Sequence, residues 1–152
     1  MKKIGYTLIL LVLVLACEEV FDPPPKALLE VQITNTDTLD TSIPLVTVYG
    51  VGMDSIWIDQ VETNTIRLPL STGESSSFVL MLDSVADTLT IIHENELIFE
   101  SAETGFYNQY KIKDIEHTLY RIDDYDVVDS MVTKNWHENI QLYINPLPAD
   151  DN

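Results

Sequence analysis

The stretch Ala27–Thr34, with the sequence ALLEVQIT, decides the fold class of this 152-residue chain. Its apolar side chains recur at every second position, and polar side chains stand between most of them. Successive side chains of a β-strand point to opposite faces, so this period of two predicts a strand with one buried and one solvent-facing side. The same alternation returns at Ile66–Leu70 and at Ile140–Ile144.

Other apolar runs predict additional strands. Three of them are apolar on both faces, which is typical of central strands: Leu45–Val51, Phe78–Leu82 and Thr88–Ile92. Five more are rich in the β-branched and aromatic residues that favour a pleated surface: Ser55–Asp59, Leu97–Ser101, Phe106–Ile112, Thr118–Ile122 and Val127–Thr133.

Turn residues such as Gly73–Ser75 and Glu94–Glu96 separate these runs at intervals of about 8–12 residues, the spacing of a sandwich or barrel. No long stretch shows an apolar stripe with helical spacing and helix caps. Pro69 cannot donate a hydrogen bond to a neighbouring strand, so its strand should lie at a sheet edge or end there. We therefore predict an all-β fold, a single antiparallel β-sandwich (immunoglobulin-like or related) over residues 27–145. A small β-barrel is the alternative.

The first residues of the chain have the order of a secretory signal peptide. Lys2 and Lys3 give a positive start, and the apolar run Ile4–Ala16 follows. This run is shorter than the ~20 helical residues that cross a bilayer, so we interpret residues 1–16 as a signal peptide. Cys17, the only cysteine, comes next, and the junction Val14–Cys17 (VLAC) resembles the lipobox of bacterial lipoproteins.

The lipobox resemblance implies cleavage before Cys17 and attachment of lipid to its thiol. We expect the acyl chains to anchor the protein at the outer membrane, on its periplasmic face or at the cell surface. A tether covers residues 17–26, in which Pro23–Pro25 favour an extended chain. The pair Glu18-Glu19 resembles an export signal of Bacteroidota surface lipoproteins. Residues 146–152 are predicted to be a flexible tail.

The composition limits the partners. Eight Lys and Arg against 25 Asp and Glu give a formal net charge of −17. A field of that sign repels phosphate backbones, which excludes nucleic acid as a partner, and it disfavours contact of the folded domain with anionic lipid. We expect contact with the membrane through the lipid on Cys17, and an unidentified protein or glycan as the partner of the domain.

Catalytic patterns are missing from the sequence. There is no Gly-x-Ser-x-Gly, and no local spacing links His93, His117 or His137 to a serine. Neither His-x-His nor His-Glu-x-x-His occurs, so a zinc site has no support. We interpret the three histidines as surface or half-buried strand residues and predict a domain that is not an enzyme.

Two alternatives remain open, a calcium-dependent binding module and a hydrolase. Calcium takes six to eight oxygen ligands, mostly from loops. The densest acidic segment is interpreted as a loop, in which Asp123, Asp124 and Asp126 are the candidate calcium ligands. A hydrolase acting on a polymer needs two carboxylates roughly 5–10 Å apart. With 25 acidic residues such a pair arises by chance, so the sequence names none.

One tripeptide, Asp-Ser/Thr-aliphatic, occurs five times and resembles an acceptor motif for O-glycosylation of exported Bacteroidota proteins. A turn aspartate followed by the start of a strand produces the same tripeptide, so both interpretations stand. The hydroxyls that would carry the sugar are those of Thr38, Ser55, Ser84, Thr88 and Ser130.

Five segments carry a resemblance to a known family: LLEVQI at Leu28–Ile33, VTVYGVGMDS at Val46–Ser55, IRLPL at Ile66–Leu70, DTLTII at Asp87–Ile92 and LIFESAETGF at Leu97–Phe106. In this order they resemble a family of small Bacteroidota lipoproteins that carry a domain of unknown function. The family usually has Cys-Gly where this chain has Thr104-Gly105. This departure removes the thiol and weakens any redox role for this chain. The resemblance implies an all-β lipoprotein and implies no activity, ligand or catalytic residue.

Overall fold

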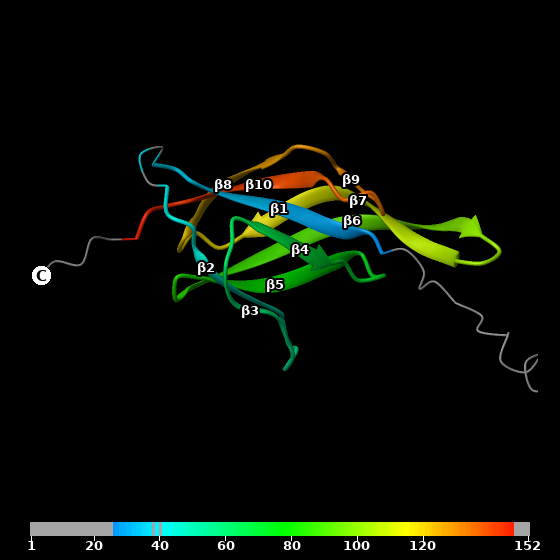
Figure 1. The fold of residues 1–152 in the computed structure, drawn as a ribbon, viewed down its shortest axis with the longest axis horizontal. Helices are drawn as coiled ribbons and strands as arrows, with labels where there is room; N and C mark the ends of the chain where they lie inside the picture. The colour runs from blue at the N-terminus through cyan, green and yellow to red at the C-terminus, as the bar shows by residue number, and fades with distance from the viewer. Residues whose placement is uncertain (1–25, 38, 40, 148–152) are drawn as a thin grey trace, which may run out of the picture.

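The computed structural model describes residues 26–37, 39 and 41–147. The predicted signal peptide, Cys17, most of the tether and residues 148–152 lie outside this part. The described part contains strands and no helix (Figure 1), and therefore no helix that could cross a membrane. The strands are β1 (Leu28–Asn35), β2 (Leu45–Gly50), β3 (Ile56–Glu62), β4 (Thr65–Pro69), β5 (Ser75–Leu82), β6 (Val85–Ser101), β7 (Gly105–His117), β8 (Ile122–Val127), β9 (Met131–Val132) and β10 (Glu138–Ile144).

Two sheets pack face to face, which confirms the predicted all-β sandwich. One sheet has the order β4-β1-β10-β8 and the other has the order β3-β2-β5-β6-β7-β9. One pair departs from the antiparallel prediction, because β1 and β10 run parallel, with Val31 opposite Ile140. A parallel pair needs a long crossover connection, and here the whole chain between the first and last strands supplies it.

The core lies between the two sheets and follows the alternation of the sequence. Leu29, Val31 and Ile33 of β1 are buried, and Leu80 and Leu82 of β5 face them from the other sheet. Each such side chain contributes ~2 kcal/mol by leaving water. The same inner faces bury further apolar residues: Val46, Val48, Ile66, Leu68, Leu89, Ile91, Ile140, Leu142 and Ile144.

The β6–β7 hairpin is much longer than predicted. The expected turn at Glu94–Glu96 is wrong, because β6 continues through it and Asn95 pairs with Tyr110 of β7. The side chains of Glu94–Leu97 are exposed, so this part of the strand tolerates polar residues. The polar residues therefore show where the strand leaves the core, and the chain does not reverse there. The chain reverses after Ser101 instead, and re-enters the sheet at Gly105, whose φ of 78° suits glycine.

Two predicted strands that follow β7 are also wrong in part. Residues 118–121 form a loop, and β8 begins only at Ile122. The predicted strand Val127–Thr133 is interrupted, since β8 ends at Val127 and β9 contains only Met131 and Val132. The consequence is that the acidic segment which follows Ile122 lies inside β8.

A buried carboxylate explains the loop after β7. Asp87 of β6 is 1% exposed and accepts main-chain hydrogen bonds from Tyr120 (2.9 Å), Arg121 (2.6 Å) and Ile122 (3.0 Å). Its Oδ1 also accepts from the hydroxyl of Thr118 at 2.6 Å. These N–H groups are therefore satisfied by a side chain rather than by a neighbouring strand, and the segment stays irregular.

The edge strands of the two sheets meet at one side of the sandwich. As predicted, β4 is an edge strand, and Pro69 is its last residue. β3 is the edge of the other sheet and is exposed along most of its length. The indole Nε1 of Trp57 in β3 donates to the main-chain oxygen of Arg67 in β4 at 2.7 Å, which ties the two edges together.

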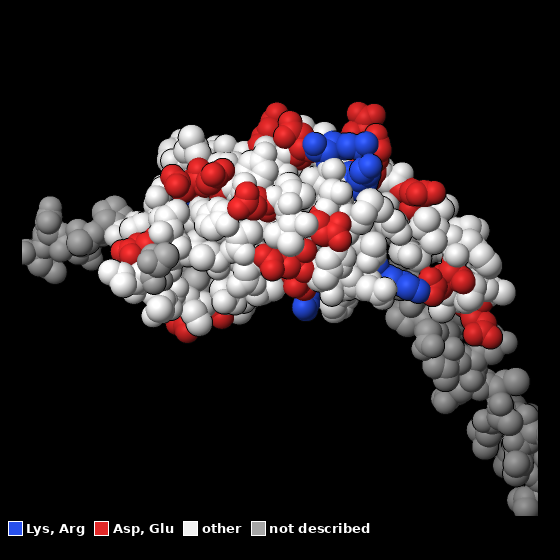
Figure 2. Space-filling view, turned by 90° about the horizontal axis from the view of Figure 1, so that it is seen from above, with Lys and Arg blue, Asp and Glu red and all other residues white. Residues whose placement is uncertain are grey.

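The charge of the domain is spread out. In Figure 2 acidic side chains are scattered over the viewed face, with few basic side chains among them. The net charge of −17 therefore acts as a general negative field and not as one acidic patch.

Candidate functional site

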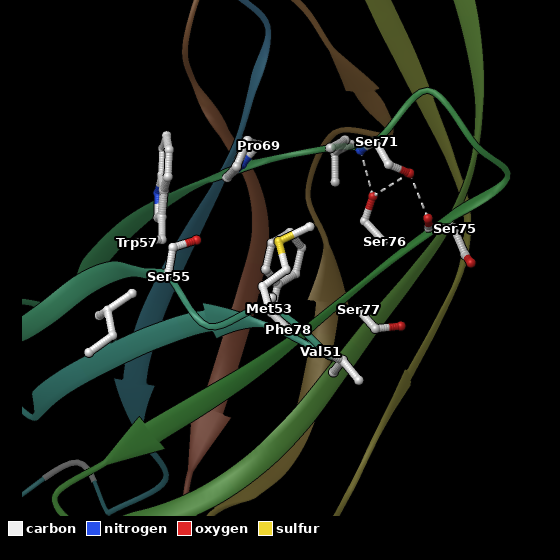
Figure 3. Close-up of a pocket in the computed structure, with 13 residues that line it drawn as sticks. Val51, Met53, Ser55, Trp57, Pro69, Ser71, Ser75, Ser76, Ser77 and Phe78 are labelled. Atoms are coloured by element: carbon white, nitrogen blue, oxygen red, sulfur yellow. Dashed lines mark hydrogen bonds between the residues drawn. The ribbon is translucent and has the colours of Figure 1, made fainter.

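A cavity of about 560 Å³ opens beside Trp57, between the turn from β2 to β3 and the loop from β4 to β5 (Figure 3). Its walls come from residues of both connections and from the start of β5. The size lies within the ~300–1,000 Å³ of small-molecule sites. Because two sheet edges meet here, side chains that are far apart in the sequence surround one space.

One wall of the cavity is apolar and open to solvent. Met53, Ile56 and Trp57 are 64%, 54% and 51% exposed, while Phe78 is buried at the base. Figure 3 shows the Met53 side chain over the ring of Phe78, and the indole of Trp57 standing beside Pro69. Single exposed apolar side chains are ordinary, but three large ones on the rim of one cavity indicate a binding surface.

The other wall carries serine hydroxyls, and hydrogen bonds hold it in place. The Ser71 N–H donates to Oγ of Ser76 at 2.8 Å, and the Ser71 hydroxyl donates to the main-chain oxygen of Ser75 at 2.8 Å. Figure 3 shows these contacts along the loop. No residue that lines the cavity is charged, although 22% of the chain is. The cavity is therefore a neutral site on a strongly acidic protein.

A buried serine–histidine pair lies behind this wall. Oγ of Ser76 is 2.9 Å from Nε2 of His93, and the two residues are 7% and 2% exposed. The interpretation of His93 as a surface or half-buried residue is therefore wrong. The alternation of buried residues along β6 already places His93 on the inner face, and the β5–β6 ladder brings Ser76 beside it.

Trp57 also borders two neighbouring hollows. One, of about 470 Å³, is lined by residues that include Val61 and Arg67. The other, of about 360 Å³, lies toward Lys26 and Phe106. We call the cavity together with the first hollow the Trp57 face. Trp136 lines none of these three spaces, because Arg67 covers its ring at 4.8 Å and its Nε1 donates to the Lys26 oxygen.

The candidate calcium ligands lie in a strand and not in the predicted loop. Asp123, Asp124 and Asp126 are exposed residues of β8, and each makes its own contacts. Asn145 donates to Asp123 at 3.3 Å, and the Tyr143 hydroxyl donates to Asp126 at 2.9 Å, which raises the pKa of Tyr143. In the part of the chain that the structure describes, no group of three or more acidic, histidine or cysteine side chains could hold a metal ion. The calcium hypothesis gains no geometric support.

The other two histidines are partly exposed, as predicted. His117 contacts the Thr118 main-chain oxygen through Nδ1 at 3.0 Å. His137 contacts the Asn135 main-chain oxygen and lies 3.0 Å from Asp129, and these two contacts, the first more than the second, raise its pKa. The pKa of Asp129 is lowered, chiefly by the N–H of Met131.

Two remaining sequence hypotheses concern carboxylates and hydroxyls. A hollow of about 330 Å³ is bordered by Glu94 and Glu96, but these lie side by side on one strand, and Glu94 is paired with Lys113 at 2.7 Å. They do not face each other across a cleft, as a glycosidase pair would. Of the hydroxyls in the repeated tripeptide, those of Ser55 and Ser84 are exposed, Thr88 and Ser130 are half-buried, and Thr38 lies outside the described residues.

Comparisons with known proteins give one match. No curated protein and no solved structure matches the chain. Residues 45–144, from the start of β2 to the end of β10, match the family described as "Family of unknown function (DUF6452)". The match includes the Trp57 face and the Ser76–His93 pair. Because it covers most of the sequence, the chain belongs to this family of unknown function, DUF6452.

Proposed function

We propose that this protein is a lipid-anchored lipoprotein whose β-sandwich is a non-catalytic domain that binds a neutral glycan on the Trp57 face. The observation that carries the binding proposal is the uncharged cavity of about 560 Å³ beside the half-exposed Trp57. The anchor is carried by the sequence, through Cys17 at the end of a short apolar run.

The two walls of the cavity match the two sides of a sugar ring. A neutral sugar presents C–H groups on its faces and hydroxyls around its rim. Trp57 and Met53 offer an apolar surface of the kind on which such a face packs, and the Ser71 hydroxyl and the main-chain oxygen of Ser75 lie on the opposite wall. Among the described residues no lysine or arginine lines the cavity, and Arg67, which lines the first hollow, is already paired with Glu30, so the Trp57 face offers no free counterion to a carboxylate or phosphate.

The extent of the surface favours a chain of sugars over a single one. Trp57 lies between the cavity and the hollow of about 470 Å³ near Val61, so a ligand in one space can continue into the next. The field of a protein with net charge −17 repels polyanions, which favours an uncharged polymer. Protein partners are the competing class, and the binding test below distinguishes them.

The non-catalytic part of the proposal rests on the geometry around the cavity. Among the described residues, the serine–histidine contact at its wall, between Ser76 and His93, is buried and has no acid to orient Nδ1 of the imidazole. No carboxylate lines the cavity. A bound glycan would therefore meet neither an activated hydroxyl nor an acid and base pair.

Titration calorimetry on the processed protein tests the binding. The probes are neutral hexasaccharides of glucose, xylose and mannose, with an acidic galacturonate hexamer for comparison. We expect at least one neutral probe to bind, and Trp57→Ala to weaken it at least about tenfold, since truncating a central aromatic costs ~2 kcal/mol. Trp136→Ala is the matched control and should leave the affinity unchanged.

Three outcomes would count against the proposal. They are failure of every neutral probe, preference for the acidic hexamer, and equal losses in the two tryptophan variants. If a protein ligand competes at Trp57 while no sugar binds, the glycan assignment is wrong.

The anchor is tested separately by labelling cells with palmitate, which should mark the wild type and leave Cys17→Ala unmarked. Acyl label on the variant would contradict Cys17 as the lipid site.

A further inference from the structure

The β6–β7 hairpin extends beyond the four-stranded sheet, at the end of the sandwich where β1 begins (Figure 1). Within the sandwich its inner face carries buried side chains such as Tyr110 and Ile112. Farther out, nothing from the opposite sheet covers this face in the described part of the chain. The hairpin therefore projects from the domain as a two-stranded arm.

The inner face of the arm stays apolar after it leaves the core. In the ladder Asn95 pairs with Tyr110 and Phe99 with Phe106, so Leu97, Phe99 and Phe106 lie on the same face as Tyr110. These three residues are 61%, 59% and 55% exposed, and the two phenyl rings are in contact, with centroids 5.1 Å apart. We call Leu97, Phe99 and Phe106 the overhang.

The overhang lies beside the point where the chain leads to the expected lipid. Lys26, the first residue that the structure describes, lines the same hollow as Phe106. Nine peptide units separate Cys17 from Lys26 in the sequence. At ~3.5 Å per extended residue, Lys26 can be no more than ~30 Å from Cys17. This step rests on the proposed lipid at Cys17, which would hold the overhang close to a bilayer.

Two basic side chains at this end of the domain form ion pairs. Lys134 forms an ion pair with Glu100 and lies 5.8 Å from the centre of the Tyr107 ring, while Arg67 pairs with Glu30 at 2.7 Å. Aromatic rings with nearby basic groups are typical of protein surfaces at the membrane–water boundary. The net charge of −17 disfavours anionic headgroups, so a zwitterionic lipid surface fits this end best.

We propose that the overhang inserts Phe99, Phe106 and Leu97 into the interfacial layer of a zwitterionic membrane, beside the lipid anchor. The contact fixes the orientation of the domain. The anchored end faces the bilayer, and the opposite end, with the loop between β7 and β8, points away from it.

Fluorescence quenching by brominated lipid tests this orientation. The native lipidated protein is reconstituted into phosphatidylcholine vesicles that carry bromine high on the acyl chains. In a background of Trp57→Phe and Trp136→Phe, a single tryptophan is placed by Phe99→Trp. The matched control is Leu119→Trp, in the exposed loop at the opposite end of the domain. Both positions are more than half exposed, so neither change disturbs the core.

We expect the tryptophan at position 99 to shift to shorter wavelength and to lose most of its emission, while the one at position 119 keeps it. Equal quenching of both, or of neither, in protein that floats with the vesicles would overturn the overhang proposal and leave the anchor intact. Protein that does not float, with an unmodified Cys17 by mass spectrometry, would overturn the anchor and this inference together.

Discussion

Nε2 of His93 lies 2.9 Å from Oγ of Ser76, and this contact joins β6 to the start of β5 behind the cavity. Ser76 receives a further hydrogen bond from the N–H of Ser71 at 2.8 Å, so the pair also holds the loop from β4 to β5. The serine wall of the binding site therefore depends on a buried imidazole that a ligand in the cavity does not touch.

Removal of the Ser76 hydroxyl should destabilise the domain. Ser76→Ala leaves Nε2 of the buried His93 and the N–H of Ser71 without their hydrogen-bond partner. We expect a loss of ~1–3 kcal/mol in the free energy of unfolding, measured by urea denaturation. Ser55→Ala, at an exposed position on the same cavity, should change it by less than ~0.5 kcal/mol. Equal effects of the two changes would contradict the structural role of Ser76.

A serine-directed fluorophosphonate should leave Ser76 unlabelled, since this hydroxyl is buried and no acid orients Nδ1 of His93 to make it an effective base. Mass spectrometry of tryptic peptides after incubation with the probe checks this result. Specific labelling of Ser76 that is lost in His93→Gln would show an activated nucleophile and contradict the non-catalytic proposal.

Two histidines should titrate on opposite sides of their ordinary pKa of 6.5. Burial lowers the pKa of His93, while hydrogen bonds to Asn135 and Asp129 raise that of His137. Imidazole proton shifts followed by NMR against pH give both values. His93→Gln and His137→Gln assign the signals, and the reverse order of the two pKa values would contradict the structure.

The lowered pKa of His93 has a consequence for stability. The folded state keeps His93 neutral, whereas the unfolded chain takes up a proton near pH 6.5. Its contribution is therefore complete above that pH and is lost as the pH falls through 6.5 toward the folded-state pKa. Denaturation curves from pH 8 to 5 should show a smaller fall in stability for His93→Gln than for the wild type. Parallel curves would count against this assignment.

Asp87 should be among the most sensitive positions of the domain. Its carboxylate accepts main-chain hydrogen bonds from Tyr120, Arg121 and Ile122, and no other strand is placed to replace them. We expect Asp87→Ala to lower the free energy of unfolding by at least ~3 kcal/mol, because several donors lose their acceptor. Asp124→Ala, an exposed carboxylate in β8, should cost less than ~0.5 kcal/mol. A mild Asp87→Ala would mean that the loop finds other acceptors.

Calcium should leave the melting temperature unchanged. The carboxylates of Asp123, Asp124 and Asp126 lie along a strand and make separate contacts, so they do not surround a common point. Melting curves in calcium chloride and in chelator check this. A rise in melting temperature that disappears when all three are changed to Asn would restore the calcium hypothesis.

The sequence predicts the fold class because apolar and polar residues alternate along the strands in the same way as buried and exposed side chains. Leu29, Val31 and Ile33 face the core, and Pro69 lies at the end of an edge strand, as their positions indicate. One failure comes from the interpretation of polar residues as a turn. Asn95 is polar because the hairpin leaves the sandwich there, and the chain continues straight through it.

The candidate site is harder to predict from the sequence, because contacts between strands create it. Trp57 and Arg67 lie in different sheets, and only the packing of two edge strands brings them together. His93, by contrast, follows the alternation of Leu89 and Ile91 along β6, so the sequence period does place it on the inner face, and the β5–β6 ladder adds Ser76 beside it. A contact between two sheet edges leaves no periodic signal, so the sequence distinguishes Trp57 only as one of two tryptophans.

The most direct test of the glycan proposal is a nitrogen–proton NMR spectrum of the protein during titration with the neutral hexasaccharides. The two tryptophans give two indole N–H signals, which Trp57→Phe and Trp136→Phe assign. We predict that one of the sugars shifts the Trp57 signal together with the amides of Ser76 and Phe78, and that the Trp136 signal stays in place. If the Trp57 signal does not move with any sugar, or if only the Trp136 signal moves, the Trp57 face is not the binding site.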